Sequence, residues 1–373
     1  MKKCRQENCE KRPSYAIKNN PPIYCNLHKK ENMIVVTTRK CLEENCEKQS
    51  SFNLPNTKGG IYCNEHKKEN MIDVENKLIL GFHTTISPSI IHGIKFNEET
   101  HKNNESEYKM AAQIFLKSPM RVGKSKFTQK DCDITKAYLE NNDTYLVVHG
   151  QYIINFIKTD NDWALNSVID DIKTLDQMIP ENNKSKTGVI IHMGKNMNKE
   201  SIDKCIENFY KNVKEVIDKT RDCKTKLILE TSTKTKNGND IFHNIETFGK
   251  LKTYLKSNLS TEEYARIGYC IDTAHVFASG YNIKTKEAFE DFISLWDNHI
   301  NDITLFHLND SKVGLGCCRD LHEQIGNGLI YSDNKDGLKS LLEFAQNNDI
   351  PIIIESGGNQ DTEIKLIQEL LQY

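Results

Sequence analysis

Six short apolar runs of the sequence each end in a histidine or an acidic residue. The terminal residues are His149, His192, Glu230, Asp272, His307 and Glu355. Imidazole and carboxylate groups that converge can bind a divalent ion, and zinc accepts both kinds of ligand. A zinc ion polarises a phosphoryl oxygen and lowers the pKa of water, so that hydroxide is available near neutral pH. The pattern therefore points to a metal-dependent reaction.

Three further candidate ligands lie close to these runs. His275 follows Asp272 by three residues, and Asp320 and His322 lie in the segment after His307. Any one of them has an ordinary alternative role, because a single strand-end histidine is usually hydrogen-bonded and a single aspartate usually caps a helix. Together the set contains five His, two Asp and two Glu. Buried charges of this number need compensation, and the set is large enough for two or three metal ions.

The apolar runs also predict the fold that must position these residues. Eight β-rich runs alternate with longer polar segments, each with room for a helix. The runs cover residues 78–85, 111–117, 145–150, 188–194, 226–232, 267–272, 303–310 and 350–356, and helical periodicity is clearest at 202–217, 288–296 and 337–345. We therefore expect an α/β protein with a (β/α)8 TIM barrel, whose site lies at the carboxyl ends of the strands. An open doubly wound sheet is the alternative.

A second set of candidate ligands forms a direct repeat near the N-terminus. The two copies read Cys4-x4-Cys9-x15-Cys25-x2-His28 and Cys41-x4-Cys46-x16-Cys63-x2-His66. Three thiolates and one imidazole suit a tetrahedral zinc ion. A unit this short buries too little apolar surface to fold without a metal, so two structural zinc sites are expected rather than chance cysteines in a disordered tail. The pattern resembles a short Cys/His repeat in proteins of large DNA viruses and brown algae.

The N-terminal region that contains the two repeats also differs in net charge from the rest of the chain. Residues 1–72 contain 14 Lys and Arg against 8 Asp and Glu, a net charge of +6, and the remainder contains 36 against 44, a net charge of −8. A basic appendage can contact a polyanion, although a lysine-rich proteome produces the same bias. We expect a small zinc-stabilised module over residues 1–72, a linker over 73–77 and the barrel over 78–373.

The sequence gives no sign of a membrane or secreted protein. No apolar run approaches the roughly 18 residues that a spanning helix needs. No apolar segment follows the charged N-terminal residues, as a secretory signal would require. We therefore expect an intracellular protein with no membrane partner, which in a large DNA virus would occupy the host cytoplasm, the viral factory or the virion.

The barrel motifs resemble those of the endonuclease IV family of abasic-site (AP) endonucleases. The resemblance covers about residues 78–373 and is most specific at residues 271–281, 307–312, 320–322 and 326–328. It implies a trinuclear zinc site. By this resemblance the first zinc is held by His149, His192 and Glu230, the second by Glu230, Asp272, His307 and Glu355, and the third by His275, Asp320 and His322. Glu230 and Glu355 are the implied catalytic residues, which position the metals and orient the nucleophile.

The same resemblance implies a reaction in base excision repair of DNA damage. Family members hydrolyse the phosphodiester 5′ of an abasic site in double-stranded DNA, which leaves a 3′-hydroxyl and a 5′-deoxyribose phosphate. Tyr152 matches a family residue near the abasic nucleotide. We expect Met120 or Arg121 to enter the gap left by the missing base and Lys312 to lie near the scissile phosphate. The segments at 84–92 and 117–122 depart from the family pattern where the family touches DNA.

The sequence is also compatible with other functions. A sugar or sugar-phosphate isomerase on a related barrel would favour a carboxylate-dominated site with a catalytic lysine, and a zinc scaffold without activity would retain the ligands alone. The N-terminal repeats could serve as a nucleic-acid clamp, as a docking module for a protein partner or as a virion-packaging tag. In all, we expect three zinc ions in the barrel and two in the repeats.

Overall fold

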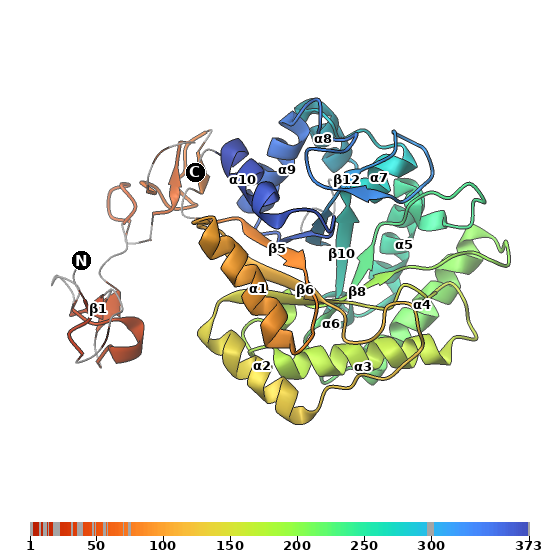
Figure 1. Ribbon diagram of the computed structural model, residues 1–373, viewed down its shortest axis with the longest axis horizontal. Helices are drawn as coiled ribbons and strands as arrows, with labels where there is room; N and C mark the ends of the chain where they lie inside the picture. The colour runs from red at the N-terminus through yellow and green to blue at the C-terminus, as the bar shows by residue number, and fades with distance from the viewer. Residues whose placement is uncertain are drawn as a thin grey trace. The chain divides into compact units, whose positions relative to one another are not determined.

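The chain forms two compact units in the computed structural model, Met1–Asn76 and Lys77–Tyr373 (Figure 1). The structure describes residues 76–296 and 302–371 throughout. It describes residues 3–73 except 7–8, 10–12, 14, 18–22, 31–32, 36–39, 47, 49, 55–56, 58 and 70. The boundary between the units falls in the segment expected to be a linker, of which residues 74 and 75 lie outside the described part.

Eight parallel strands close into a barrel, as the sequence predicts. They are β5 (Ile79–His83), β6 (Lys109–Ile114), β7 (Thr144–His149), β8 (Gly188–His192), β9 (Lys226–Glu230), β10 (Ile267–Asp272), β11 (Ile303–Leu308) and β14 (Ile352–Ile354). Each strand pairs with the next in this order, and β14 pairs with β5, so the sheet has no edge. This closure confirms the TIM barrel and excludes the open doubly wound sheet.

Helices surround the barrel (Figure 1). They are α1 (Ile90–Asn103), α2 (Gln129–Asn141), α3 (Asp162–Met178), α4 (Ile202–Lys219), α5 (Ile245–Asn258), α6 (Thr261–Tyr264), α7 (Thr273–Ser279), α8 (Lys286–Ser294), α9 (Asp336–Asn347) and α10 (Gln360–Leu371), with 3-10 turns η2 (Lys184–Lys186) and η3 (Ile241–His243). The three helices expected from periodicity correspond to α4, α8 and α9. Among the described residues, none of the helices has both the length and the apolar character needed to cross a bilayer.

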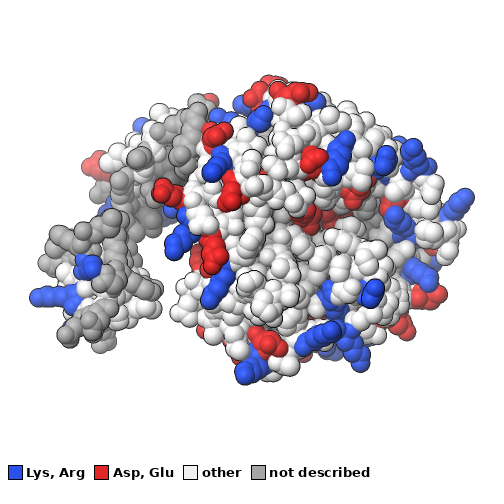
Figure 2. Space-filling model, in the orientation of Figure 1, with Lys and Arg blue, Asp and Glu red and all other residues white. Residues whose placement is uncertain are grey.

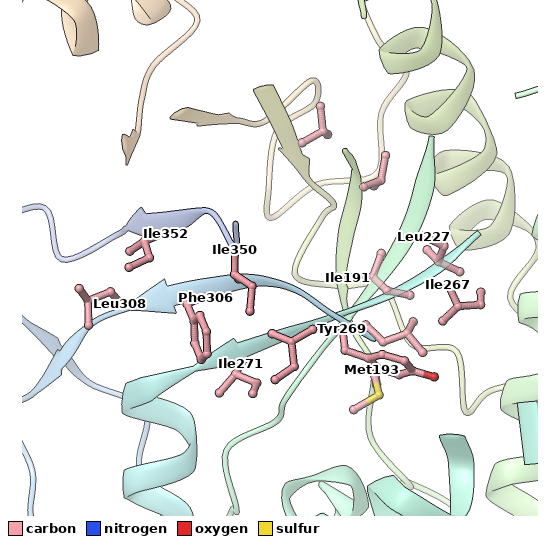
Figure 3. Packing of buried hydrophobic residues seen from close by; sticks show 14 of the residues in the cluster. Ile191, Met193, Leu227, Ile267, Tyr269, Ile271, Phe306, Leu308, Ile350 and Ile352 are labelled. Carbon is pink, nitrogen blue, oxygen red and sulfur yellow. The ribbon is translucent and has the colours of Figure 1, made fainter. Parts of the chain in front are cut away.

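Alternation along the strands sorts their side chains into two layers of core. Outward-facing residues such as Tyr269 and Phe306 pack in the layer between strands and helices (Figure 3). The inward-facing residues form a smaller apolar layer, with one member from each of seven strands. Its members are Ala111, Val147, Ile190, Ile228, Cys270, Leu305 and Ile353. Because residues i and i+2 of a strand face the same side, the next inward residue of each strand lies toward its carboxyl end.

The two N-terminal repeats fold alike. In the first, β1 (Tyr15–Ala16) pairs with β2 (Ile34–Val35), and in the second, β3 (Phe52–Asn53) pairs with β4 (Ile72–Asp73). An additional bridge joins Tyr15 to Tyr24 in one copy and Phe52 to Tyr62 in the other. The 3-10 turn η1 (Asn26–His28) ends at the histidine of the first copy.

A lysine buried among aromatic rings, Lys252, should make the stability of the barrel depend on pH. The side chain of Lys252 is 1% exposed, and its Nζ lies 4.4 Å from the ring centroid of Tyr269 and 4.9 Å from that of Trp296. Burial lowers the pKa of Lys252 to about 8, although Asp302, whose Oδ2 lies 3.7 Å from the Nζ, acts in the opposite direction. The unfolded chain, with an ordinary lysine, binds more protons than the folded one between about pH 8 and 10.5, so the free energy of unfolding should rise with pH in this window.

We predict that Lys252→Met is more stable than the parent at pH 7, because it removes the burial of an ammonium group. The difference, on the order of 1 to 3 kcal/mol, should shrink toward pH 10. Thermal unfolding at both pH values measures it, with Lys250→Met, an exposed lysine of the same helix, as the control. A difference that stays constant from pH 7 to pH 10 would contradict the prediction.

Candidate metal centre

A polar layer lies directly beyond the inner apolar layer of the barrel. The residues two positions after its seven members are Gln113, His149, His192, Glu230, Asp272, His307 and Glu355. On β5 the equivalent residue is His83, which is in register with Gln113. The structure therefore brings together the six strand-end residues named from the sequence. It adds Gln113 and His83, which sequence reasoning missed.

Glu230 lies at the centre of this layer. Its Oε2 is 3.1 Å from Nε2 of His192 and 3.4 Å from Nε2 of His149, while its Oε1 is 2.8 Å from Nδ1 of His307. The same Nδ1 of His307 is 3.3 Å from Oε2 of Glu355. Glu230 thus joins two groups of donor atoms, one on the β7–β8 side and one on the β11–β14 side.

The remaining three candidate ligands form a third group near the opening of the barrel. Nε2 of His275 is 3.1 Å from Oδ2 of Asp320, and Nε2 of His322 is 3.0 Å from Oδ1 of Asp320. Oδ2 of Asp272 lies 3.7 Å from Nε2 of His322 and so connects this group to the layer below. Side-chain exposure rises from 1% at Glu230 to 42% at Asp320. All nine candidate ligands therefore form one connected network.

The start of α7 explains why Asp272 and His275 lie where they do. Asp272 is the N-cap of α7, and its Oδ1 accepts a hydrogen bond from the backbone N–H of His275 at 2.8 Å. This leaves Oδ2 of Asp272 facing the network. One aspartate therefore both begins the helix and serves the site, so the capping role and the ligand role considered for it are compatible.

A buried aspartate holds the loop that carries Asp320 and His322. Strands β12 (Asp310–Ser311) and β13 (His322–Glu323) pair as a hairpin, with Ser311 opposite His322. The carboxylate of Asp310 accepts backbone hydrogen bonds of 2.9 to 3.0 Å from Gly326, Gly328 and Ile330. A Cβ at Gly328 would lie 2.4 Å from Oδ1 of Asp310, so only glycine fits there.

Hydrogen bonds fix the orientation of three imidazoles. Nδ1 of His149 donates to the backbone oxygen of Gly150, and Nδ1 of His275 donates to that of Thr231, both at 2.7 Å. Nε2 of His307 donates to Oε1 of Gln113 at 2.8 Å. In each ring the second nitrogen then faces the carboxylates of the network. Outer partners of this kind fix the tautomer of a metal-binding histidine.

These contacts provide a test of whether a cation fits the site. A nitrogen lone pair that faces a carboxylate oxygen at 2.8 to 3.4 Å is repelled unless positive charge lies between them. Within the described part of the chain, Oε2 of Glu230 and Nε2 of His322 are buried and have no hydrogen-bond partner. Both atoms belong to the network. The donor set therefore fits metal ions that take nitrogen and oxygen ligands.

The buried carboxylates and imidazoles of the network shift one another's pKa values. Burial by itself raises the pKa of Glu230, but the imidazoles of His192 and His307 hold it well below its ordinary value. Burial by itself lowers the pKa of His307, but Cys270, Glu355 and Glu230 raise it well above its ordinary value. The carboxylates thus attract positive charge into the centre of the barrel, either as protons on the imidazoles or as metal ions.

Two amides complete the layer around the carboxylates. Nε2 of Gln113 donates to Oε1 of Glu355 at 2.5 Å, which orients its Oε1 toward His307. Nδ2 of Asn309 donates to Oδ2 of Asp272 at 2.7 Å and to Oε2 of Glu355 at 3.2 Å. The period-2 rule applied to β6 from Ala111 identifies Gln113, and this signal was available in the sequence.

The residues proposed to touch DNA lie around the mouth of the site. Tyr152 is 42% exposed, and the centroid of its ring is 5.2 Å from that of His192. Its backbone N–H donates to the oxygen of Pro119 at 3.0 Å, which attaches the loop carrying Met120 and Arg121 to the site. Met120 is 64% exposed, and Arg121 is exposed as well. Lys312 is exposed on the β12–β13 hairpin.

Two cavities mark the two ends of the barrel. One of about 370 Å³ is lined by Tyr152, His192, His275 and Asp320, so it opens onto the network. A larger one of about 580 Å³ is lined by residues such as Tyr145 and Lys226 near the amino ends of the strands, and none of the nine candidate ligands lines it. The candidate metal centre therefore lies at the smaller of these two cavities, and its donor atoms, not the cavity volume, identify it.

The eight N-terminal candidate ligands form two groups of four, and the donor atoms of each group all lie within 4.8 Å of one another. In the first, Sγ of Cys9 and Sγ of Cys25 are 3.8 Å apart, and Nδ1 of His28 is 3.6 Å from Sγ of Cys4 and 3.4 Å from Sγ of Cys25. In the second, the corresponding distances among Cys41, Cys46, Cys63 and His66 are 3.8, 3.6 and 3.3 Å. Zinc–sulfur bonds of about 2.3 Å in a tetrahedron place sulfur atoms about 3.8 Å apart. Both groups fit zinc.

Charges are mixed on the face of the barrel that Figure 2 draws. In the view of Figure 2, lysine and arginine side chains alternate with acidic ones, without a continuous basic stripe. Electrostatic attraction of a polyanion to this face must therefore come from local groups, or from other parts of the chain.

Family models match both units. Residues 108–373 match the family described as xylose isomerase-like TIM barrel, and residues 4–37 and 41–75 each match the EsV-1-7 cysteine-rich motif. The first match covers the part of the barrel that carries the whole network. The second confirms that the N-terminal Cys/His pattern is a repeated motif.

Several relatives are similar to the barrel over most of their length. A protein of Acanthamoeba polyphaga mimivirus assigned as an endonuclease 4 is 32% identical over 65% of this chain and 76% of its own length. Apurinic-apyrimidinic endonuclease 1 of Saccharomyces cerevisiae is 31% identical over 69% of this chain and 68% of its own length. A Thermosipho melanesiensis protein assigned as an endonuclease 4 is 32% identical over 73% of this chain and 91% of its own length.

Solved structures show the same fold. Endonuclease IV from Thermus thermophilus superposes with a TM-score of 0.59 at 21% identity, covering 79% of this chain and 99% of that one. A D-tagatose 3-epimerase-like protein superposes with a TM-score of 0.55 at 16% identity, covering 78% and 97%. An endonuclease and an epimerase-like protein thus share this fold, whereas the sequence relatives described above are endonucleases. The chain belongs to the endonuclease IV family of the xylose isomerase-like TIM barrels.

Proposed function

We propose that this protein is a zinc-dependent AP endonuclease that hydrolyses the phosphodiester 5′ of abasic sites in double-stranded DNA. The products would be a 3′-hydroxyl and a 5′-deoxyribose phosphate. Relatives that are AP endonucleases support the general activity. The observation that carries the proposal is the connected network of nine donor residues at the carboxyl end of the barrel.

The charge of the network suits three zinc ions and an anionic substrate. Its four carboxylates carry a charge of −4, and its five histidines are neutral when they bind metal through a lone pair. Three Zn²⁺ ions carry +6, which leaves a net charge of about +2 for a phosphodiester. Zinc held there would supply Lewis-acid charge to the phosphoryl oxygens and a water-derived nucleophile near neutral pH.

The chain itself would position the metals and receive the DNA. Glu230 joins the first two donor groups, and Asp272 connects the third, so displacement of either would disturb the geometry of the whole centre. Tyr152 and the loop with Met120 and Arg121 would contact the DNA around the abasic nucleotide, with Lys312 near the phosphate. Exposed side chains at the mouth can stack on bases, and flipping is easiest where no base stacks.

The isomerase alternative is less well supported by the site. An isomerase of the kind considered above would need a lysine facing the substrate, and none of the residues in the polar layer is a lysine. Lys195 lines the cavity that opens onto the network, where its Nζ lies 3.9 Å from Oδ1 of Asp240. The nearby Lys117 is buried and paired, with Nζ 2.9 Å from Oδ2 of Asp170 and 3.0 Å from Oδ1 of Asp171. It is therefore directed into the scaffold.

We predict that Glu230→Gln reduces nicking of an abasic duplex by at least about 100-fold, because it removes the charge shared by two donor groups. The fold should be retained, as judged by circular dichroism, since the substitution keeps the size of the side chain. Glu343→Gln, on the exposed face of α9, is the control. Turnover of Glu230→Gln near that of the parent would reject this active site.

We predict about five zinc ions per chain, three in the barrel and two in the repeats. A chain that starts at Asp73 should retain three, because none of the barrel donors is removed. Inductively coupled plasma mass spectrometry of the two proteins measures the counts. One zinc ion or none in the shorter chain would reject the trinuclear centre.

Gln113 is predicted to act as a positioning residue. Gln113→Leu removes the acceptor for Nε2 of His307 and the donor to Glu355. Zinc affinity of the barrel should fall about 10- to 100-fold, as is typical when a partner of a ligand is removed. Nicking should fall with it and be largely restored by excess zinc. Zinc affinity equal to that of the parent, measured by chelator competition, would contradict this role.

A further inference from the structure

The two N-terminal repeats carry the same arrangement of lysines on aromatic rings. In the first copy, Nζ of Lys29 lies 4.8 Å from the ring centroid of Tyr15, and Nζ of Lys30 lies 5.3 Å from that of Tyr24. In the second copy, Nζ of Lys67 lies 4.6 Å from the ring centroid of Phe52, and Nζ of Lys68 lies 4.9 Å from that of Tyr62. The arrangement therefore occurs twice at equivalent positions.

The backbone of each repeat builds this arrangement. The two rings of a copy come from residues joined by a β-bridge, Tyr15 with Tyr24 and Phe52 with Tyr62, so they lie on neighbouring segments. The lysine pair directly follows the histidine of the Cys/His group, His28 in the first copy. The same group of donor atoms that fits zinc thus positions two adjacent ammonium groups over two adjacent rings. We name each such unit of two rings and two lysines a lysine platform.

The ammonium groups of the platforms are available to a ligand. All four lysines are exposed, and none forms an ion pair with a carboxylate among the described residues. Of the acidic residues near the second lysine pair, Glu65 is paired with Lys48, whereas Glu43 and Glu69 form no ion pair with Lys67 or Lys68 among the described residues. The aromatic rings restrict the motion of the lysine side chains, which lowers the entropy lost when they bind.

We propose that the two lysine platforms bind the phosphate backbone of DNA without regard to sequence and hold the duplex for the barrel. Paired ammonium groups repeated along the chain match the regular anionic phosphates of a duplex. The module has a net charge of +6 and the remainder a net charge of −8, so the net positive charge that attracts a duplex belongs to the module. Because both units belong to one chain, binding by one raises the local concentration of DNA at the other.

The inference rests on the proposed function only in its choice of DNA as the polyanion. Its test measures binding to a short undamaged duplex, which is not cut at an abasic site. The full-length, zinc-loaded protein is compared with a variant carrying Lys29→Gln, Lys30→Gln, Lys67→Gln and Lys68→Gln. Fluorescence anisotropy over a range of salt concentrations gives the affinity and the slope of log affinity against log salt.

The variant should bind about tenfold or more weakly at low salt. Its slope should be shallower by about two to four units, at about 0.9 for each phosphate that is no longer neutralised. Single-turnover cleavage of saturating abasic duplex should be unchanged, because no barrel donor is altered. An unchanged slope would overturn the inference and would favour a protein partner for the repeats.

A matched control removes the same charge elsewhere. Lys211, Lys219, Lys250 and Lys286 are exposed helix residues of the barrel, each paired with a glutamate four residues away. Their replacement by Gln should leave the slope near that of the parent, whereas an equal loss in both variants would show that only net charge matters and would overturn the inference. Replacement of the four platform lysines by Arg should retain the parent slope.

Zinc content and cleavage separate the possible failures. If the Lys→Gln variant loses zinc, the Lys→Arg variant, which keeps the charge, is compared with the parent instead. A parent-like slope in the Lys→Arg variant supports a role of the positive charge, and a shallower slope contradicts it. A protein that binds DNA through the platforms but never nicks an abasic duplex would contradict the proposed activity and leave the platforms supported. If the protein nicks an abasic duplex normally but the parent and the platform variant have equal slopes, the proposed activity is supported and the inference about the platforms is overturned.

Discussion

Four carboxylates and five imidazoles share the centre of one barrel, and their mutual electrostatics constrain the rest of the structure. Glu230 makes contacts of about 3 Å with His192 and His307 while it is almost fully buried. Nitrogen lone pairs that face carboxylate oxygens in such a place require positive charge between them. The hydrogen bonds that turn His149, His275 and His307 toward the carboxylates are in this sense the framework of a cation site.

The barrel meets this constraint through the two-residue period of its strands. One apolar residue from each of seven strands fills the interior, and the next inward residue of each is polar, so the candidate ligands lie on a packed apolar layer that excludes water from one side. Strand closure then brings side chains from β7 and β14, far apart in sequence, into one layer. The third donor group depends on two aspartates: Asp272, which belongs to this layer and also starts α7, and Asp310, which holds the loop after β11.

Much of this was predictable from the sequence, since strand-end histidines and acidic residues are conspicuous at the ends of apolar runs. Gln113 and His83 were not predicted, because an amide is not a typical zinc ligand and a single histidine is usually structural. The two-residue period of β5 and β6 nevertheless identifies both as inward-facing residues of the polar layer. The last strand is shorter than expected: Pro351 has no N–H to donate, and β14 begins only at Ile352. The run expected to end at Asp310 stops at Leu308, because Asp310 turns away into the β12–β13 hairpin. The exposed residues of the mouth, such as Met120, follow no apolar period, so the sequence pattern does not assign them a role.

The most direct test of the metal centre is the position of zinc in a crystal of the protein. An anomalous difference map recorded at the zinc absorption edge should show three peaks in the barrel. One should lie among His149, His192 and Glu230, one among Glu230, Asp272, His307 and Glu355, and one among His275, Asp320 and His322. A zinc-loaded crystal with no peak beside Glu230, or with a single peak in the whole barrel, would contradict the account.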